Sequence, residues 1–266
     1  MVNRVPFAAR ATAVILGAAI LFFMLAPLAV VVGASLTAGQ FLSFPPQGLS
    51  LRWYQAVLSS PAYLSAAWTS LQLAVLVMVA ATVIGTPVAI ALTRHRLPGS
   101  QIVAGLFLSP LILPTIIFGI GILIFFSLYA DGPSLTALWL GHTVITLPYV
   151  IRTVIAVLED SDPAVEEAVR TMGANWWQRY WHGILPQCYG GMAAGAFFAF
   201  NISFDEAVIA LFLRTPELQT LPLKIYAELE FSPDPSVAAV STVMIAMTVV
   251  LIVIIDRLLG LGRVTG

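Results

Sequence analysis

The chain has 266 residues, of which 59% are hydrophobic and 9% are charged, and its formal net charge is −1. Soluble domains carry roughly a quarter charged residues, so this composition excludes an ordinary soluble protein and predicts an all-α polytopic membrane protein. No basic patch with interleaved aromatic residues is present, so nucleic acid is not an expected partner. The single Cys188 excludes an intrachain disulfide, and the three histidines lack neighbours at ligand spacing, so no metal site is expected.

The first predicted membrane span is residues 11–36, an uncharged run that is long enough to cross ~30 Å of hydrocarbon. A basic start followed by an apolar run also describes a signal peptide. This run is about twice the length of a signal peptide's apolar core and contains Pro27, so we interpret it as an uncleaved span. Residues 37–62 are expected to form an external loop with a short helix near 54–58, so that 1–62 makes the first region of the chain.

The second region, residues 63–259, is predicted to contain five more spans. Pro110 and Pro114 lie inside the second of these and are expected to kink it, because proline removes a backbone hydrogen bond. Residues 131–133 predict a tight turn. The remaining residues, 260–266, are expected to form a tail. The five spans are predicted at 63–93, 102–129, 135–158, 187–213 and 236–255.

The distribution of Lys and Arg predicts the orientation of these six spans. Nine of the twelve basic residues lie on the side that holds both termini and the loops at 94–101 and 159–185. Because basic residues favour the cytoplasmic side, both termini are expected in the cytoplasm of a bacterial cell, with the spans in its inner membrane.

The segment between the fourth and fifth spans reads as two short helices. Asp162 is a suitable N-cap for a helix that has Pro163 at its first position. Gly173 is expected to end that helix in the left-handed conformation. A second helix is predicted over 175–182, where four aromatic residues gather along one side.

The same segment carries a motif with fixed spacing. Glu167, Ala168 and Val169 are followed by three residues and Gly173, and then by nine residues and Gly183, Ile184, Leu185 and Pro186. This resembles the EAA loop of binding-protein-dependent ABC importer permeases, whose pattern is Glu-Ala-Ala, three residues, Gly, nine residues, Ile, any residue, Leu-Pro. Two positions depart from the pattern, since Val169 replaces the second Ala and Gly183 replaces Ile.

The resemblance implies a type I ABC importer permease (MetI-like) fold with six transmembrane helices, in which loop 159–186 forms the coupling helices that dock in a groove of a cytoplasmic ATPase. The residues expected to couple to the ATPase are Glu166, Glu167, Ala168, Arg170, Gly173, Ala174, Trp177, Leu185 and Pro186. A simpler interpretation is a pair of amphipathic helices that lie at the membrane surface, with tryptophans at headgroup depth.

A second informative stretch, residues 201–206, places two adjacent carboxylates between apolar runs. If one helix continues from 187 to 213, each acid costs about 2.5–3.5 kcal/mol at mid-membrane, which suggests a cation, an arginine or water as a partner. Alternatively, the pair simply ends the span at the outer headgroups, and Asn201 and Ser203 bond backbone carbonyls four residues back. The expected substrate-pathway residues are Asn201, Ser203, Phe204, Asp205 and Glu206.

This stretch, with Thr220-Leu221-Pro222 and the Leu147-Pro148-Tyr149-Val150 run, is similar to the second permease subunit of spermidine/putrescine importers. The resemblance implies a polyamine substrate, which acidic and aromatic side chains would suit through charge and cation–π contact. That branch also contains permeases for opines, aminophosphonates and other small solutes.

Other function classes fit the sequence less well. A secondary transporter needs internal inverted repeats, and a channel subunit a filter-like loop or rings of charge. Hydrolase motifs are missing, and the chain has no phosphate-binding Gly-x-x-x-x-Gly-Lys-Ser/Thr loop, so we expect no cofactor here and ATP with Mg on a partner chain. The expected partners are a second similar permease, two copies of the ATP-binding subunit, an external solute-binding protein and membrane lipid.

Overall fold

The computed structural model describes residues 7–94, 99–215, 217–231 and 233–259. Regular structure in these ranges is helical, apart from an isolated antiparallel bridge between Thr37 and Leu49. The chain divides into two compact units, one made of residues up to 61 with 227–247 and the other of 62–226 with the residues from 248 onwards.

The first unit contains α1, Phe7–Ser35, and the short helix α2, Arg52–Ser59. Residues Ala9–Ser35 are long and apolar enough to cross a membrane, as predicted. The loop between the helices is held by side chains, because the Ser35 and Tyr54 hydroxyls lie 2.6 Å apart and the Trp53 indole donates to the Gly39 carbonyl at 3.3 Å. The predicted short helix in the external loop is confirmed, although it begins two residues earlier.

In the second unit, two further helices meet the criteria for a membrane span, α3, Pro61–Arg94, and α6, Leu135–Glu159. Between them lie α4, Ser100–Leu108, a 3-10 turn, η1, Ser109–Leu111, and α5, Thr115–Tyr129. The predicted turn between α5 and α6 is confirmed by Gly132, whose φ is 83°. The Ser134 hydroxyl then caps α6 by accepting from the Ala137 amide at 3.2 Å.

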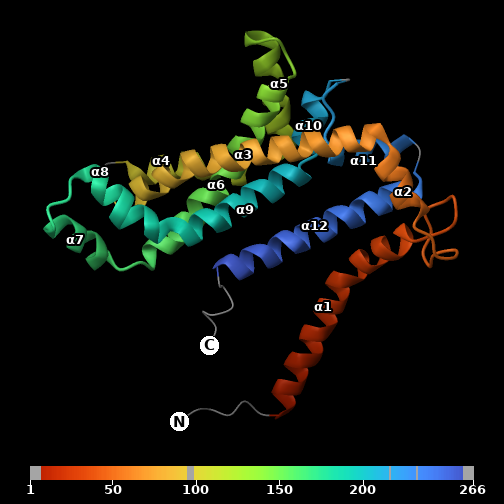
Figure 1. Ribbon diagram of the computed structural model, residues 1–266, viewed down its shortest axis with the longest axis horizontal. Coiled ribbons are helices and arrows are strands. Elements are labelled where there is room, and N and C mark those ends of the chain that lie inside the picture. The colour runs from red at the N-terminus through yellow and green to blue at the C-terminus, as the bar shows by residue number, and fades with distance from the viewer. Residues whose placement is uncertain (1–6, 95–98, 216, 232, 260–266) are drawn as a thin grey trace. The chain divides into compact units, whose positions relative to one another are not determined.

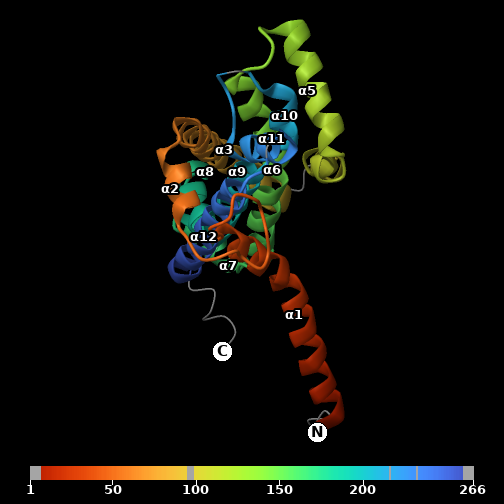
Figure 2. The same cartoon turned by 90° about the vertical axis from the view of Figure 1, so that its right-hand side faces the viewer.

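The expected kink in the span at 102–129 is confirmed but is far larger than a proline bend within one helix. The α4–η1 segment and α5 meet at 99°, with the break just before Pro114 (Figure 2). The physical reason is that Pro110 and Pro114, about one helical turn apart, each lack the N–H that an α-helix needs, so the α-helix gives way to a 3-10 turn and then ends. This part of the chain is therefore a broken span or a re-entrant loop and not one straight crossing.

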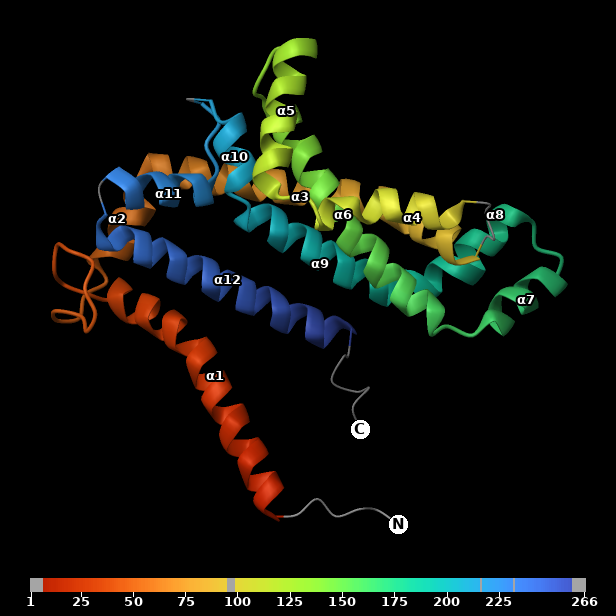
Figure 3. The same cartoon turned by 180° about the vertical axis from the view of Figure 1, so that it is seen from behind.

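The centre of the second unit is the pair formed by α6 and α9, Tyr189–Asp205, which run side by side (Figures 1 and 3). Two glycines let the backbones approach closely. A Cβ on Gly191 would lie 2.7 Å from the Thr153 carbonyl oxygen, and one on Gly195 would lie 2.8 Å from the Val150 Cα. Small residues of this kind at helix contacts are typical of membrane proteins. Figure 3 shows α7 and α8 at the end of this helix pair that lies away from α10.

The predicted fifth span is not one helix. After the 17 residues of α9 the helix stops at Asp205, and a short helix, α10, Val208–Leu213, follows. Seventeen residues reach about 26 Å, slightly less than the ~30 Å of a bilayer core. The polar stretch after it contains α11, Leu221–Phe231, which sequence reasoning missed, and the chain then enters α12, Pro235–Leu259.

Within the described residues, four helices are long and apolar enough to span a membrane, or five if the bent pair counts as one span. The all-helical class is confirmed, but the number of six spans is not. The shortfall comes from the two places just described, where the apolar sequence is continuous and the helix is not.

Candidate functional site

The first helix of the predicted coupling loop, α7, Pro163–Thr171, begins and ends as expected. The Asp162 carboxylate accepts from the Ala164 amide at 2.8 Å, and Pro163 occupies the first turn. The helix ends at Gly173, whose φ of 82° lies in the left-handed region. An added Cβ at Gly173 would meet open space, so the requirement for glycine comes from the backbone and not from packing.

The second helix, α8, Trp176–Arg179, is fixed at its start by a capping box. The Asn175 side chain accepts from the Gln178 amide, and the Gln178 side chain accepts from the Asn175 amide, both at 2.9 Å. Instead of ending at His182 as predicted, the helical run continues through a π-helical turn, η2, Tyr180–Ile184, and a 3-10 turn, η3, Leu185–Cys188. This run joins α9, so α8 is mechanically continuous with it.

The predicted coupling residues divide into an inner and an outer set. Glu166 and Leu185 face the chain itself, since Leu185 is buried and Glu166 forms ion pairs with Arg94 at 3.4 Å and Arg179 at 2.7 Å. Ala174 is half-buried. The outer, exposed set consists of Glu167, Ala168, Arg170, Gly173, Trp177 and Pro186. The outer set is the part of the segment that another protein can reach.

The two departures from the EAA pattern face each other. A Cβ built on the buried Gly183 would lie 3.6 Å from Cγ2 of Val169 and 3.9 Å from the Cα of Glu166. The larger residue, Val169, therefore lies directly beside the smaller residue, Gly183, at the distance of an ordinary contact for an added Cβ. The two changes compensate each other in volume, which keeps α7 packed on η2.

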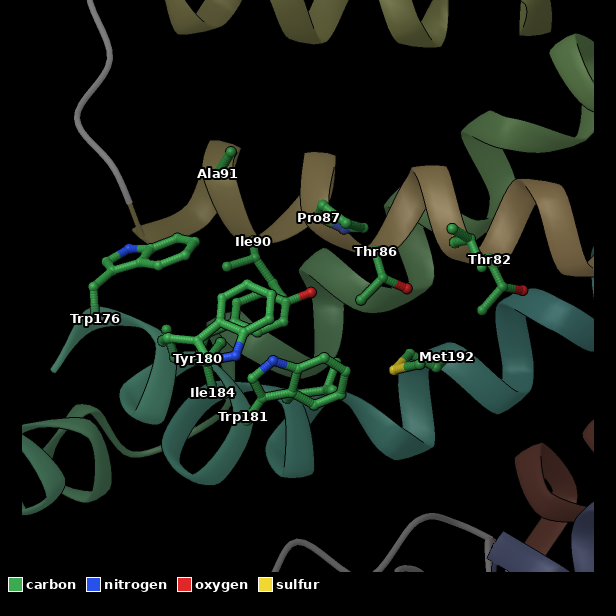
Figure 4. Close-up of a pocket in the computed structure, with 13 residues that line it drawn as sticks. Thr82, Thr86, Pro87, Ile90, Ala91, Trp176, Tyr180, Trp181, Ile184 and Met192 are labelled. Carbon is green, nitrogen blue, oxygen red and sulfur yellow. The ribbon is translucent and has the colours of Figure 1, made fainter. Parts of the chain in front are cut away.

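The aromatic residues of the segment line a groove of about 640 Å³ against the last third of α3. Trp176, Tyr180 and Trp181 lie on one side of it and Pro87 and Ile90 on the other (Figure 4). The rings contact one another, with Trp176 and Tyr180 stacked at 5.9 Å between centroids. Partial burial, with a smaller effect of Cys188, raises the pKa of the Tyr180 phenol above its ordinary value.

Trp177 belongs to this aromatic cluster and is still 58% exposed. It stacks on Tyr180 at 6.1 Å and meets Trp181 edge-on at 5.7 Å. A tryptophan in this place suits contact with an ATPase and equally suits headgroup depth, so both interpretations of the segment remain for Trp177.

The predicted pathway residues surround the helix break at the end of α9. Ser203 is buried, and its hydroxyl lies 3.0 Å from Nδ1 of His142, which is completely buried in α6. Phe204 is buried against Phe200, with the rings stacked at 5.7 Å. Asn201 bonds the carbonyl four residues back at 3.1 Å, as the alternative interpretation expected.

The two adjacent carboxylates have different environments. The Glu206 carboxylate accepts from the Val208 amide at 2.7 Å and from the Ile209 amide at 3.1 Å, so it caps the start of α10. Asp205, one residue earlier, is exposed and forms no ion pair among the described residues. Of the two side chains, Asp205 is the more exposed.

Two residues connect the helices that carry these sites, and the sequence had not predicted either of them as a site residue. His142 links α6 to α9, and Arg94 links the end of α3 to the coupling segment. A signal for His142 was present, because a histidine inside an apolar span needs a polar partner. Arg94 was counted only for its charge, since its partner lies 72 positions further along the sequence.

Residues 14–261 match the family model described as "Binding-protein-dependent transport system inner membrane component". The chain belongs to this family. The spermidine/putrescine permease protein PotC of Escherichia coli strain K12 is 30% identical over 235 residues, which cover 88% of this chain and 89% of PotC. The putrescine permease protein PotI of the same strain is 29% identical over 84% of this chain and 82% of PotI. The sulfate permease protein CysT of that strain is also 29% identical, over 79% of this chain and 81% of CysT.

Solved ABC transporters share the fold. A bacterial importer of the acidic polysaccharide alginate gives a TM-score of 0.66 at 16% identity, covering 97% of this chain and 98% of that chain. The MetNI methionine transporter in its inward-facing form gives 0.63 at 20% identity, covering 74% and 94%. The chain is therefore a multi-pass inner-membrane permease subunit of an ABC importer with a MetI-like fold and is not an enzyme. Its family implies a separate ATPase and a solute-binding protein as partners.

Proposed function

We propose that this permease imports a polyamine such as putrescine or spermidine. Two features support a cationic solute. Relatives named for these solutes are 29–30% identical over more than four fifths of this chain. An exposed carboxylate, Asp205, also lies at the helix break that follows α9. The sulfate permease is nearly as similar, so overall identity does not separate a cation from an anion, and the exposed Asp205 is the observation that favours the cation.

The proposed assembly contains a second, homologous permease subunit, two copies of the ATPase and an external solute-binding protein. The second permease is needed because a pathway between helices requires walls on both sides. Nine of the twelve Lys and Arg residues lie on the side that holds both termini and the loops at 94–101 and 159–185, which supports a cytoplasmic position for the termini and the coupling segment. The outer set of exposed coupling residues would then meet the ATPase.

In the proposed mechanism, closure of the ATPase moves α7 and α8, and the connected spans change the side to which the pathway opens. The continuous helical run from α8 into α9 gives a direct route from the ATPase to the region of Asp205. The pathway residues are then exposed alternately to the two sides of the membrane.

The test is uptake of labelled putrescine by the complete transporter in liposomes. We expect ATP-dependent uptake that requires the solute-binding protein, and no exchange without ATP. Asp205→Asn should raise the KM for putrescine about 10–100-fold, because hydrogen bonds to charged groups contribute about 1.5–3 kcal/mol. Asp131→Asn, which removes an exposed carboxylate in the turn before α6, is the control and should leave the KM unchanged.

Three results would contradict parts of this proposal. Uptake of an opine or an aminophosphonate but not of putrescine would refute the polyamine substrate, while the assignment as an ABC importer would stand. Solute flux without ATP would indicate a channel or a secondary transporter. An unchanged putrescine KM in Asp205→Asn would refute the role of this carboxylate.

A further inference from the structure

Glu166 lies between two arginines that come from different elements. Its Oε2 is 3.4 Å from Nε of Arg94, the last residue of α3, and its Oε1 accepts from Nη2 of Arg179 in α8 at 2.7 Å. Only 16% of the Glu166 side chain and 13% of the Arg94 side chain are exposed. Ion pairs with this little contact with water are screened less by salt than surface pairs.

Arg94 makes one more contact with the coupling segment. Its Nη2 donates to the Ser161 hydroxyl at 2.6 Å, and Ser161 lies in the link between α6 and α7. The guanidinium group therefore reaches both the link and α7 itself, which suits its planar, forked shape. These contacts connect the end of α3, which lies on the cytoplasmic side in the proposed orientation, to a segment more than sixty positions later in the chain.

The three spans next to the coupling segment are attached to it in different ways. The chain itself joins α6 to α7 and α8 to α9. Helix α3 has no such backbone connection. It packs against α6 at Gly85 and shares an apolar cluster with Ile184, beside the groove of about 640 Å³. Within the described ranges, the polar contacts that connect α3 to the segment all come from Arg94.

The neighbouring Glu167 provides the contrast. Adjacent residues on a helix point about 100° apart, so when Glu166 faces the arginines, Glu167 faces away from them. Glu167 is exposed and forms no ion pair in the part of the chain that the structure describes. Of the two acids, Glu167 is available to a partner protein, while Glu166 is already engaged within this chain.

We infer that Glu166 is a positioning residue that transmits the movement of the coupling segment to α3. The inference rests on the proposed function, since it assumes that an ATPase moves α7 and α8. Movement reaches α6 and α9 through the backbone, whereas it reaches α3 through side chains, by apolar packing on α6 and η2 and by the ion pair of Glu166 with Arg94. Without this pair, α7 and α8 still bind the ATPase through their outer set, but α3 is left with apolar packing alone and follows their movement less closely.

The experiment uses the complete transporter, with its ATPase and solute-binding protein, in liposomes. The variants are Glu166→Gln, Arg94→Gln and the double variant, and the control is Asp160→Asn, an exposed carboxylate of the same loop that takes part in neither ion pair. The measurements are the amount of ATPase that copurifies, the rate of ATP hydrolysis and the solute imported per ATP hydrolysed.

For Glu166→Gln we expect normal copurification and continued hydrolysis, with solute import per ATP reduced about fivefold or more. Because the two residues act through one contact, the loss in the double variant should be smaller than the product of the single losses by at least about threefold. The control should match the wild type. A purely structural role would instead lower the amount of assembled transporter and leave import per ATP unchanged.

Several outcomes would overturn the inference. Unchanged import per ATP in Glu166→Gln, or losses that simply multiply in the double variant, would show that the ion pair transmits nothing. Loss of copurifying ATPase would show that Glu166 contacts the ATPase instead.

If Glu166→Gln lowers the amount of inserted protein, the variant Arg94→Lys is used in its place. It keeps one charge but loses the fork, so import per ATP should fall less, and an unchanged ratio would again refute the inference. If the wild type imports no solute at all, the proposed function itself is refuted, whatever the variants show.

Discussion

The facing positions Val169 and Gly183 give a quantitative test of how the coupling segment is packed. A Cβ on Gly183 would make an ordinary contact with Val169 at 3.6 Å, so Gly183→Ala should be close to neutral. Isoleucine, the residue of the EAA pattern, adds three more carbons, which must displace Val169 or the backbone of α7 at Glu166. Overpacking of this kind typically costs about 1–3 kcal/mol.

The reverse substitution, Val169→Ala, removes two methyl-sized groups from a half-buried position. At about 0.8 kcal/mol for each fully buried group, the cost is about 1 kcal/mol. The double variant Val169→Ala with Gly183→Ile restores the EAA pattern, and the new side chain fills the space that the valine leaves. We therefore expect the double variant to be less destabilised than the sum of the single variants by about 1 kcal/mol or more.

The assay is thermal unfolding of the purified chain, followed by the fluorescence of its six tryptophans, three of which lie in the adjacent aromatic cluster. Gly183→Ile should lower the apparent Tm by roughly 2–12 °C, from the cost of about 1–3 kcal/mol and about 2–4 °C per kcal/mol for a chain of this size. The double variant should recover most of that loss, and Gly183→Ala should stay near the wild type. Single effects that add in the double variant would show that the two side chains do not share space and would refute the reasoning.

Three further predictions concern Gly173, which separates α7 from α8, and the helix break after α9. Substitutions at Gly173 should reduce import per ATP least for Asn, more for Ala and most for Val. The reason is that a side chain in the left-handed conformation costs roughly 1–2 kcal/mol and asparagine tolerates this conformation best. Equal effects of Asn and Val would contradict this prediction. Glu206→Ala should lower the apparent Tm more than Glu206→Gln, which still accepts from the backbone of α10, and equal shifts would exclude the capping role. Ser203→Ala should cost about 1–3 kcal/mol in unfolding free energy because it leaves His142 Nδ1 unpaired, and this cost should disappear when His142→Phe is already present.

Local signals in the sequence predicted the coupling segment well. The cap at Asp162 and the left-handed Gly173 depend only on the residue and its immediate neighbours, and both are confirmed. The first span and the helices at 61–94 and 135–159 follow from uninterrupted hydrophobicity. The start of α11 also had a local signal, since Pro222 suits the first turn of a helix, and it was overlooked.

Other features could not be read from local signals. Hydropathy is the same for a continuous apolar helix and for two helices that meet at 99°, because it measures composition and not direction. The break after Asp205 has the same origin: the apolar residues on both sides suggest one helix, and only the capping contacts of Glu206 show two. Which face of α7 turns inward depends on Arg94, which is distant in the sequence.

Two of the three pairs of adjacent acids in this chain divide their roles in the same way. On α7 neighbouring side chains diverge by about 100°, and at the end of α9 the backbone becomes extended at Glu206, so in each pair the two acids have different environments. Glu166 and Glu206 are used within the chain, one in ion pairs and the other as a cap, whereas Glu167 and Asp205 are exposed beside them. Neutralising an inner member should therefore disturb stability or transmission within this subunit. Neutralising an outer member should instead change binding, of the ATPase at Glu167 and of the solute at Asp205, so ATPase copurification and solute KM should respond to different substitutions.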